Sequence, residues 1–279
     1  MRADGRKLKK VDPMYRVVPH IMVHRHDAMN MITLNIPLDP IQKYIRQKAA
    51  EGVQITHMAV ILAAYLHTIA EFPALNRFIM NRQAYAHKDI TVSMVVLKSN
   101  SMEEETMSKV YLDTTDTIFT VQEKVGGYID ENRKHSTVNS TDKIIDVLVR
   151  IPGLLRVGVA ILKGMDKCGL LPKAIIKASP FHASLLITNL ASIRTNHIYH
   201  HVYDFGTTSI SMAMGNLREV PRRTATGEIV FDRCIPIGMV MDERIASGSY
   251  FSRAFRRFKR YLKNPALLET PPEVVVKDE

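Results

Sequence analysis

The chain has 279 residues, 46% of them hydrophobic, which is enough to bury the core of one large domain and excludes a disordered chain. Its formal net charge of +10 suits nucleic acid, an anionic membrane surface or a phosphorylated small molecule. The sequence contains no zinc-finger spacing, no Gly-aromatic RNA-binding stretch and no tryptophan. We therefore expect no nucleic-acid partner.

Cysteine content and hydropathy indicate where the protein resides. Cys168 and Cys234 allow at most one disulfide in a chain that does not need one, so we expect a reducing, cytoplasmic location. The basic N-terminus lacks the uninterrupted apolar run of a secretory signal. Charged residues such as Asp146 and Arg156 interrupt the most apolar region, residues 144–176, so we predict no transmembrane segment.

Two helices are predicted in the N-terminal half. Asp39-Pro40 caps and opens an amphipathic helix that ends near Gly52. Thr56 caps a second helix, which Pro73 stops. Because the second helix is apolar on nearly all sides, we expect it at the centre of the fold.

The rest of the chain is dominated by predicted strands. Strands are expected over residues 90–98, 181–190, 207–215, 229–231 and 234–242, the last two joined by a tight turn, and helices over residues 117–132 and 249–263. The pattern lacks repeats and linkers, so we predict one domain over residues 1–279. Helices come first and strands concentrate later, which indicates an α+β fold with a mixed β-sheet.

Five segments share their order and content with one enzyme family. They read ITLNIPLDPIQKYI, ITHMAVILAAYLHTIAEFPALNRFI, AYAHKDITVSMVV, LLITNLASI and IPIGMVMDERIASGSYFSRAFRRFKRYLKNPALL. Together they resemble the catalytic core of the dihydrolipoyl acyltransferases of 2-oxo acid dehydrogenase complexes and, more distantly, chloramphenicol acetyltransferase. The resemblance spans roughly residues 15–268, with an N-terminal extension over residues 1–14, an apolar insert over 141–178 and a C-terminal tail over 269–279.

The resemblance implies a chloramphenicol acetyltransferase-like two-layer sandwich that forms homotrimers, with an active-site channel between neighbouring subunits. Coenzyme A or acyl-CoA enters as cosubstrate from one side, and a small-molecule acyl acceptor from the other. A general base activates the acceptor and a hydroxyl stabilises the oxyanion. No lipoyl domain or Pro/Ala-rich linker precedes the core, so we expect a free-standing protein.

The active-site loop departs from the family pattern of His, three residues, Asp or Asn, and Gly. In the matching DERIASG, Glu243 stands in the histidine position, Ser247 replaces the acid or amide, and Gly248 is kept. Glu243 can serve as a base if the channel desolvates it, because burial raises a carboxyl pKa. Alternatively, it pairs with Arg244 or another cation and holds the loop.

Other candidate site residues follow from the same resemblance. Thr188 takes the place of the oxyanion hydroxyl, although a threonine in a strand needs no function. His200 and His201 form either a relocated base or a polar loop, and in an extended chain at most one faces a given pocket. His182, just before the strand of Thr188, either lines the channel or is a strand-edge histidine without a role in it, and we favour the second interpretation.

No metal site is predicted. A set of His197, His201 and Asp204 lacks a strict ligand pattern. The spacing of His20, His24 and His26 fits neither HExxH nor a zinc finger, so we expect these three on the surface.

Two regions, the basic last helix and the apolar insert, each have more than one interpretation. Arg253, Arg256 and Arg257 of the last helix either contact the phosphates of coenzyme A or form a charged outer face. The apolar insert is read preferentially as extra core, with a lid, an oligomer contact or a membrane-surface helix as the alternatives.

The predicted function is acyl-CoA-dependent acyl transfer to a small molecule with a non-standard or degraded base. The alternative is a catalytically inactive pseudoenzyme that acts as a trimeric scaffold or a small-molecule binder. A membrane-surface protein is the third and least favoured hypothesis.

Overall fold

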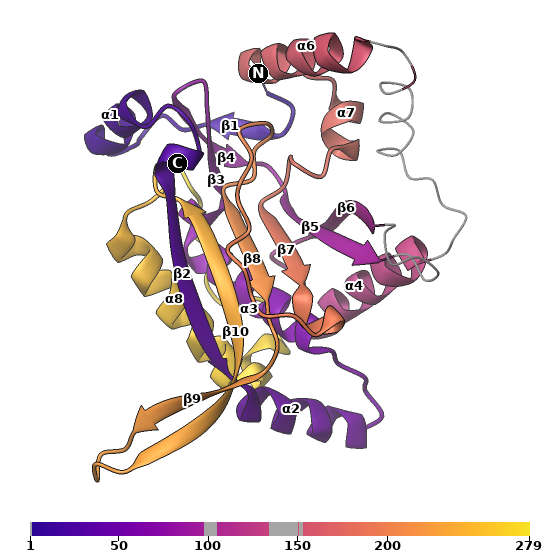
Figure 1. Cartoon of the computed structure of the whole chain (residues 1–279), viewed down its shortest axis with the longest axis vertical. Coiled ribbons are helices and arrows are strands. Elements are labelled where there is room, and N and C mark those ends of the chain that lie inside the picture. Colours follow the sequence, from indigo (N-terminus) through magenta and orange to yellow (C-terminus); the bar gives the residue numbers. More distant parts are fainter. Residues whose placement is uncertain (1, 98–104, 134–149, 151–152) are drawn as a thin grey trace.

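The computed structural model describes residues 2–97, 105–133, 150 and 153–279 (Figure 1). Its main feature is a seven-stranded sheet. The strands run in the order β2 (Met29–Pro37), β10 (Ile229–Asp242), β8 (Ile210–Met214), β7 (Leu185–Asn189), β5 (Ile90–Leu97) and β6 (Glu105–Leu112), with β9 (Arg218–Arg223) paired to β10. Strand β7 pairs in parallel with β5 and β8, whereas the other pairs are antiparallel. The predicted mixed sheet is therefore confirmed.

Helices cover one face of this sheet and form the second layer (Figure 1). They are α2 (Leu38–Ala50), α3 (His57–Glu71), α4 (Ile118–Arg133) and α8 (Gly248–Lys263). Helix α3 is buried from Ala59 to Ala70, as expected for a central helix, and Thr56 caps it by accepting the Ala59 N–H at 3.2 Å. Phe251, Phe255, Phe258 and Leu262 form the buried stripe of α8.

A long loop, residues 194–209, lies against the opposite face of the sheet. A Cβ on Gly238 of β10 would lie 2.1 Å from the Ile198 carbonyl oxygen. A Cβ on Gly215 would lie 2.0 Å from the His197 nitrogen. The Ser211 hydroxyl of β8 donates to the His200 carbonyl at 2.5 Å. Small residues on this face therefore allow the loop to approach the strands.

The N-terminal residues belong to a second, three-stranded sheet. Strand β1 (Gly5–Lys7) pairs with β4 (Gln83–His87), which pairs with β3 (Arg77–Met80). Helix α1 (Pro13–Ile21) follows β1. Buried Arg2 donates to Asp166 on α6 (Leu154–Cys168) at 2.7 Å. The predicted extension over residues 1–14 is thus attached to the fold.

Several predicted boundaries were wrong. Helix α2 begins at Leu38, and Asp39 accepts a hydrogen bond from Arg233 instead of capping the helix. The strand predicted over residues 181–190 covers Leu185–Asn189, because residues 181–184 form a turn. The strands predicted over 229–231 and 234–242 are one strand, β10, because the residues between them pair continuously with β9.

The predicted apolar insert is described only in part, and its described apolar residues are partly exposed and partly buried. Residues 141–149, 151 and 152 lie outside the described part of the chain. Helix α6 exposes Leu155, Val157 and Ile161, while Ile176 on α7 (Lys173–Ala178) is buried. Among the described residues, no helix has the length and apolarity needed to cross a bilayer.

Candidate active site

A buried ion pair anchors the loop that follows β10. Asp242 is fully buried, and the Arg244 guanidinium donates to both of its carboxylate oxygens, at 2.8 and 2.7 Å. The Nε atom of buried Arg25 lies 3.8 Å from the same carboxylate. The alternative in which Arg244 pairs with Glu243 is therefore wrong, because the fork of Arg244 is occupied by Asp242.

Glu243 is held at the edge of the sheet and is only partly buried. Its backbone N–H donates to the Ala28 carbonyl at 2.9 Å, and its Oε2 accepts a hydrogen bond from exposed Asn30 at 2.5 Å. One chain alone does not provide the desolvation that a carboxylate base requires. Asn30 was missed from the sequence, because only strand pairing brings β2 beside Glu243.

Ser247 has a local structural role in the same loop. Its Oγ accepts the Tyr250 N–H at 3.2 Å and lies 2.9 Å from the Ser249 hydroxyl. The residue is the N-cap of α8. Its side chain therefore satisfies a free N–H at the start of the helix.

A groove of about 440 Å³ opens beside Asn30 between β2 and α8. Arg256 and Lys259, one turn apart on α8, line it. Arg253 is exposed but is outside this lining, and the Arg257 Nε is engaged by Glu71 at 2.6 Å. Of the three predicted arginines, Arg256 is thus the one placed to meet an anionic ligand. The i, i+3 spacing could have identified Lys259 from the sequence.

Thr188, near the end of β7, lines a separate cavity of about 270 Å³. Apolar side chains dominate the lining, including Met58, Val96, Ile187 and Leu190. The Thr188 Oγ1 atom is buried and has no hydrogen-bond partner within the described residues. Burying an unpaired hydroxyl in an apolar cavity costs free energy, unless a ligand or a water molecule accepts a hydrogen bond from it.

Thr188 and Glu243 lie far apart on one chain. Across the sheet, Thr188 aligns with Ala213 of β8, and Ala213 aligns with Gly238 of β10. Glu243 lies five positions beyond Gly238. Two strand spacings and five residue rises correspond to roughly 15–20 Å. A single chain therefore does not bring these two side chains to one reacting carbonyl.

The loop histidines interact with each other. The rings of His200 and His201 are stacked with centroids 4.9 Å apart, so the prediction that they diverge was wrong, because the backbone there is not an extended strand. His201 is exposed and packs edge-on against Tyr203. His197 is bound to the Thr33 hydroxyl at 3.0 Å.

His182 does not line either cavity. It is buried with its Nδ1 2.8 Å from the Ser179 hydroxyl and its Nε2 3.3 Å from the Asp166 carboxylate. Asp166 also pairs with Arg2, so His182 belongs to the buried polar cluster around Arg2. The hypothesis that His182 lines the channel is wrong for this chain.

Comparison with solved structures identifies the class of fold. A probable dihydrolipoamide acetyltransferase from Listeria monocytogenes superimposes with a TM-score of 0.58 at 11% identity, covering 92% of this chain and 94% of that one. The dihydrolipoamide acetyltransferase of Azotobacter vinelandii gives 0.57 at 12%, with 93% of each chain covered. A chloramphenicol acetyltransferase gives 0.56 at 12%, covering 92% and 99%. The chain therefore has the chloramphenicol acetyltransferase-like acyltransferase fold.

A sequence comparison points to one family with this fold. Residues 182–270 match the family model of the 2-oxoacid dehydrogenases acyltransferase catalytic domain. This segment contains Thr188, the loop of Glu243 and all of α8. The resemblance predicted from the sequence is thus confirmed. No curated protein matches the chain.

Proposed function

We propose that the protein is an acyl-CoA-dependent acyltransferase that acts on a small-molecule acceptor. The observation that carries this proposal is the Thr188 hydroxyl in its apolar cavity, which has no hydrogen-bond partner among the described residues. A preorganised donor in a water-poor site stabilises the oxyanion that forms when a thioester carbonyl is attacked. In the Azotobacter vinelandii dihydrolipoamide acetyltransferase, which has the same fold, the residues investigated for a role in the catalytic mechanism are a serine, a histidine and an asparagine.

In the proposed reaction, the acceptor's hydroxyl or thiol attacks the thioester carbonyl and loses its proton to a base. Thr188 donates a hydrogen bond to the oxyanion, which collapses and expels the coenzyme A thiolate. Glu243 or His201 is the candidate base, since Glu243 has the family's histidine position and His201 is an exposed imidazole. Arg256 and Lys259 supply positive charge for the phosphates of the cosubstrate.

A complete site requires a second copy of the chain, because Thr188 and Glu243 are too far apart within one. The β9–β10 hairpin extends away from the body of the fold (Figure 1) and exposes Leu217, Ile229 and Phe231. These exposed apolar side chains on a projecting arm suit contact with a neighbouring subunit. We propose a homotrimer, with Thr188 of one subunit facing the Glu243 loop of the next.

The whole chain is proposed to fold as one domain, because β1 and Arg2 pair with elements distant in the sequence. The free thiols Cys168 and Cys234 suit a reducing compartment, and we propose a cytoplasmic location.

The first test is calorimetric titration with coenzyme A and acetyl-CoA, followed by a screen of acceptor alcohols, amines and thiols. Thr188→Val should lower kcat by about 10²–10³-fold without loss of acetyl-CoA affinity, because it removes the oxyanion donor and keeps the shape. Arg256→Ala should weaken acetyl-CoA binding. Thr195→Val, at an exposed threonine, is the matched control. Absence of acetyl-CoA binding by the folded parent protein would overturn the proposal.

Mixed oligomers test the shared site. Thr188→Val and Glu243→Gln subunits, each inactive alone, are unfolded together and refolded as a mixture. If each site takes one residue from each of two subunits, about one quarter of the sites are intact after random assembly. Recovery of no activity from the mixture would contradict a site shared between subunits.

A scaffold without catalytic activity is the second candidate. Two contacts favour it: Glu243 accepts a hydrogen bond from Asn30, and the neighbouring Arg244 is paired with Asp242. These contacts give the loop a structural role that needs no catalysis. In that case Glu243→Gln and His201→Ala leave the cellular role intact. Loss of that role by a folded Glu243→Gln variant would exclude the scaffold.

A further inference from the structure

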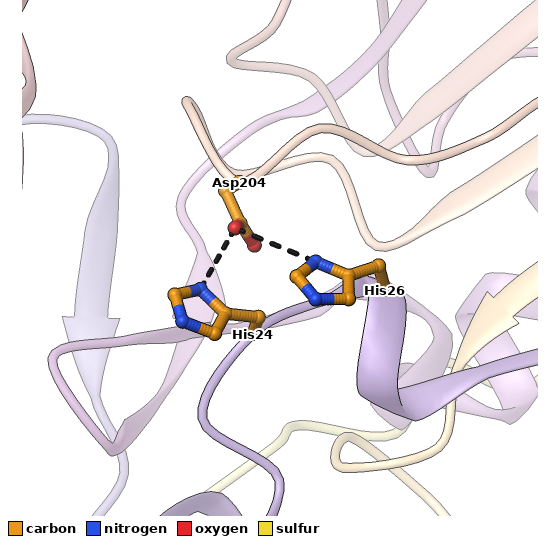
Figure 2. Close-up of side chains that lie close together, drawn as sticks. All are labelled: His24, His26 and Asp204. Carbon is orange, nitrogen blue, oxygen red and sulfur yellow. Dashed lines mark hydrogen bonds and ion pairs between the residues drawn. The ribbon is translucent and has the colours of Figure 1, made fainter.

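Two histidines and an aspartate converge on the surface near the start of β2 (Figure 2). His24 and His26 precede the strand, and Asp204 comes from the 194–209 loop. The His24 Nδ1 atom lies 2.9 Å from Asp204 Oδ2, and the His26 Nδ1 atom lies 3.9 Å from the same oxygen. One ligand atom from each residue falls within 4.8 Å of the others.

The scaffold under this cluster fixes the orientation of the carboxylate. The Arg25 backbone N–H donates to Asp204 Oδ1 at 2.8 Å, which leaves Oδ2 directed at the two imidazoles. The buried Arg25 guanidinium also donates to the Tyr203 carbonyl at 2.5 Å. The contacts from Arg25 therefore hold the Asp204 carboxylate and the neighbouring backbone in place.

The second ring nitrogen of His26 lies next to a carboxylate, as is common for histidines that bind metal ions. The His26 Nε2 atom lies 3.2 Å from Asp27 Oδ1. A carboxylate on the second ring nitrogen fixes the tautomer and makes the first nitrogen a better ligand. The His24 and His26 rings are stacked at 5.0 Å with 11° between their planes, so both Nδ1 atoms face Asp204 (Figure 2).

We propose that His24, His26 and Asp204 bind a divalent transition-metal ion of the zinc type. Two imidazoles and a carboxylate suit Zn²⁺, Co²⁺ and Ni²⁺ better than Mg²⁺ or Ca²⁺. Metal–ligand bonds of about 2.0–2.1 Å in tetrahedral geometry place ligand atoms about 3.3 Å apart. The side chains are 54%, 64% and 43% exposed, which leaves room for this adjustment and for water as a fourth ligand.

The sequence indicated no metal because Asp204 lies 180 positions from His24. Only the packing of the loop onto the sheet joins the two. The proposed site also adjoins the candidate active site, since the Arg244 guanidinium donates to the Met22 and Val23 carbonyls. A bound ion would strengthen the attachment of the loop to this segment. The proposal does not depend on acyl transfer.

The test is Zn²⁺ titration by calorimetry on protein without an affinity tag and with Cys168→Ser, which removes the exposed thiol. We expect one Zn²⁺ per chain, with proton release because the imidazoles must be neutral. His24→Ala and His26→Ala should abolish this site. Asp27→Asn should weaken it by about 10- to 100-fold, as for other outer-shell carboxylates.

Co²⁺ provides an independent readout, because its visible absorption reports imidazole and carboxylate ligation. His20→Ala, at another exposed histidine of the same region, is the control and should bind Zn²⁺ like the parent. The proposal is overturned if the parent binds no Zn²⁺, or if His24→Ala and His20→Ala bind equally. His24 is exposed, so its truncation tests the site without unfolding the protein, whereas Asp204→Asn would also disturb the contact with Arg25.

Discussion

Replacing Asp242 with asparagine tests how much the buried ion pair supports the active-site loop. The substitution keeps the size of the side chain but removes the charge that compensates Arg244 and Arg25, both of which are almost completely buried. Breaking a buried pair by removing one partner costs about 3–5 kcal/mol, because an uncompensated charge remains inside. For a chain of this size, that corresponds to a fall in Tm of about 6–20 °C.

The assay is urea unfolding followed by circular dichroism at one fixed protein concentration, since assembly links stability to concentration. Asp232→Asn is the matched control, because Asp232 pairs with Arg222 at 2.6 Å on the surface. That exposed pair should contribute much less to stability than the buried pair, because water and salt screen it. If Asp242→Asn costs no more than Asp232→Asn, the buried pair does not stabilise the loop as reasoned.

Three further predictions concern pH, assembly and packing. Burial lowers the pKa of His67 to about 4, so this histidine takes up a proton in the unfolded chain at a higher pH than in the folded protein. The free energy of unfolding should therefore fall by about 3 kcal/mol between pH 7 and pH 4. His67→Gln should remove this part of the pH dependence, as measured by urea unfolding at several pH values. Phe231→Glu on the exposed hairpin should shift the oligomer toward monomer in light scattering. Gly238→Ala places a Cβ against the Ile198 carbonyl and should destabilise the fold by about 1–3 kcal/mol in urea unfolding.

Each of these predictions has a control that the chain itself provides. His20→Gln changes an exposed histidine and should leave the pH profile unaltered. Met14→Glu alters an exposed apolar residue of α1 and should not affect assembly. Gly127→Ala, in a helix with open space around it, should stabilise by about 0.5–1 kcal/mol. Equal effects of Gly238→Ala and Gly127→Ala would show that the close approach of the loop carries no energy.

Local patterns predicted the elements whose signal is strong over many residues. The Thr56 cap and the long apolar run of α3, and the pattern of α8, placed both helices within a residue or two. The predicted helix boundary was wrong where a side chain binds a residue that is distant in the sequence. Asp39 reads as a helix cap in isolation, yet Arg233 takes its carboxylate.

The sequence predicted several residues of the candidate site but not how they are arranged in space. The sequence marked Thr188 and Glu243, and the strand register then separated them across the sheet. It also suggested Arg257 as a phosphate ligand, which Glu71 occupies, and left out Asn30 and Lys259. Hydrogen-bond partners across a sheet depend on register, which no local pattern encodes.

The sequence by itself determined the fold class and the central helix, because apolar patterning, helix capping and the order of motifs can be read along the chain. Tertiary structure alone decided that Arg244 binds Asp242 and that His24 and His26 meet Asp204. It also left the Thr188 hydroxyl without a partner in the part of the chain that the structure describes. These outcomes depend on which groups compete for one partner once distant segments are packed together, and burial sets the cost of leaving any of them unsatisfied.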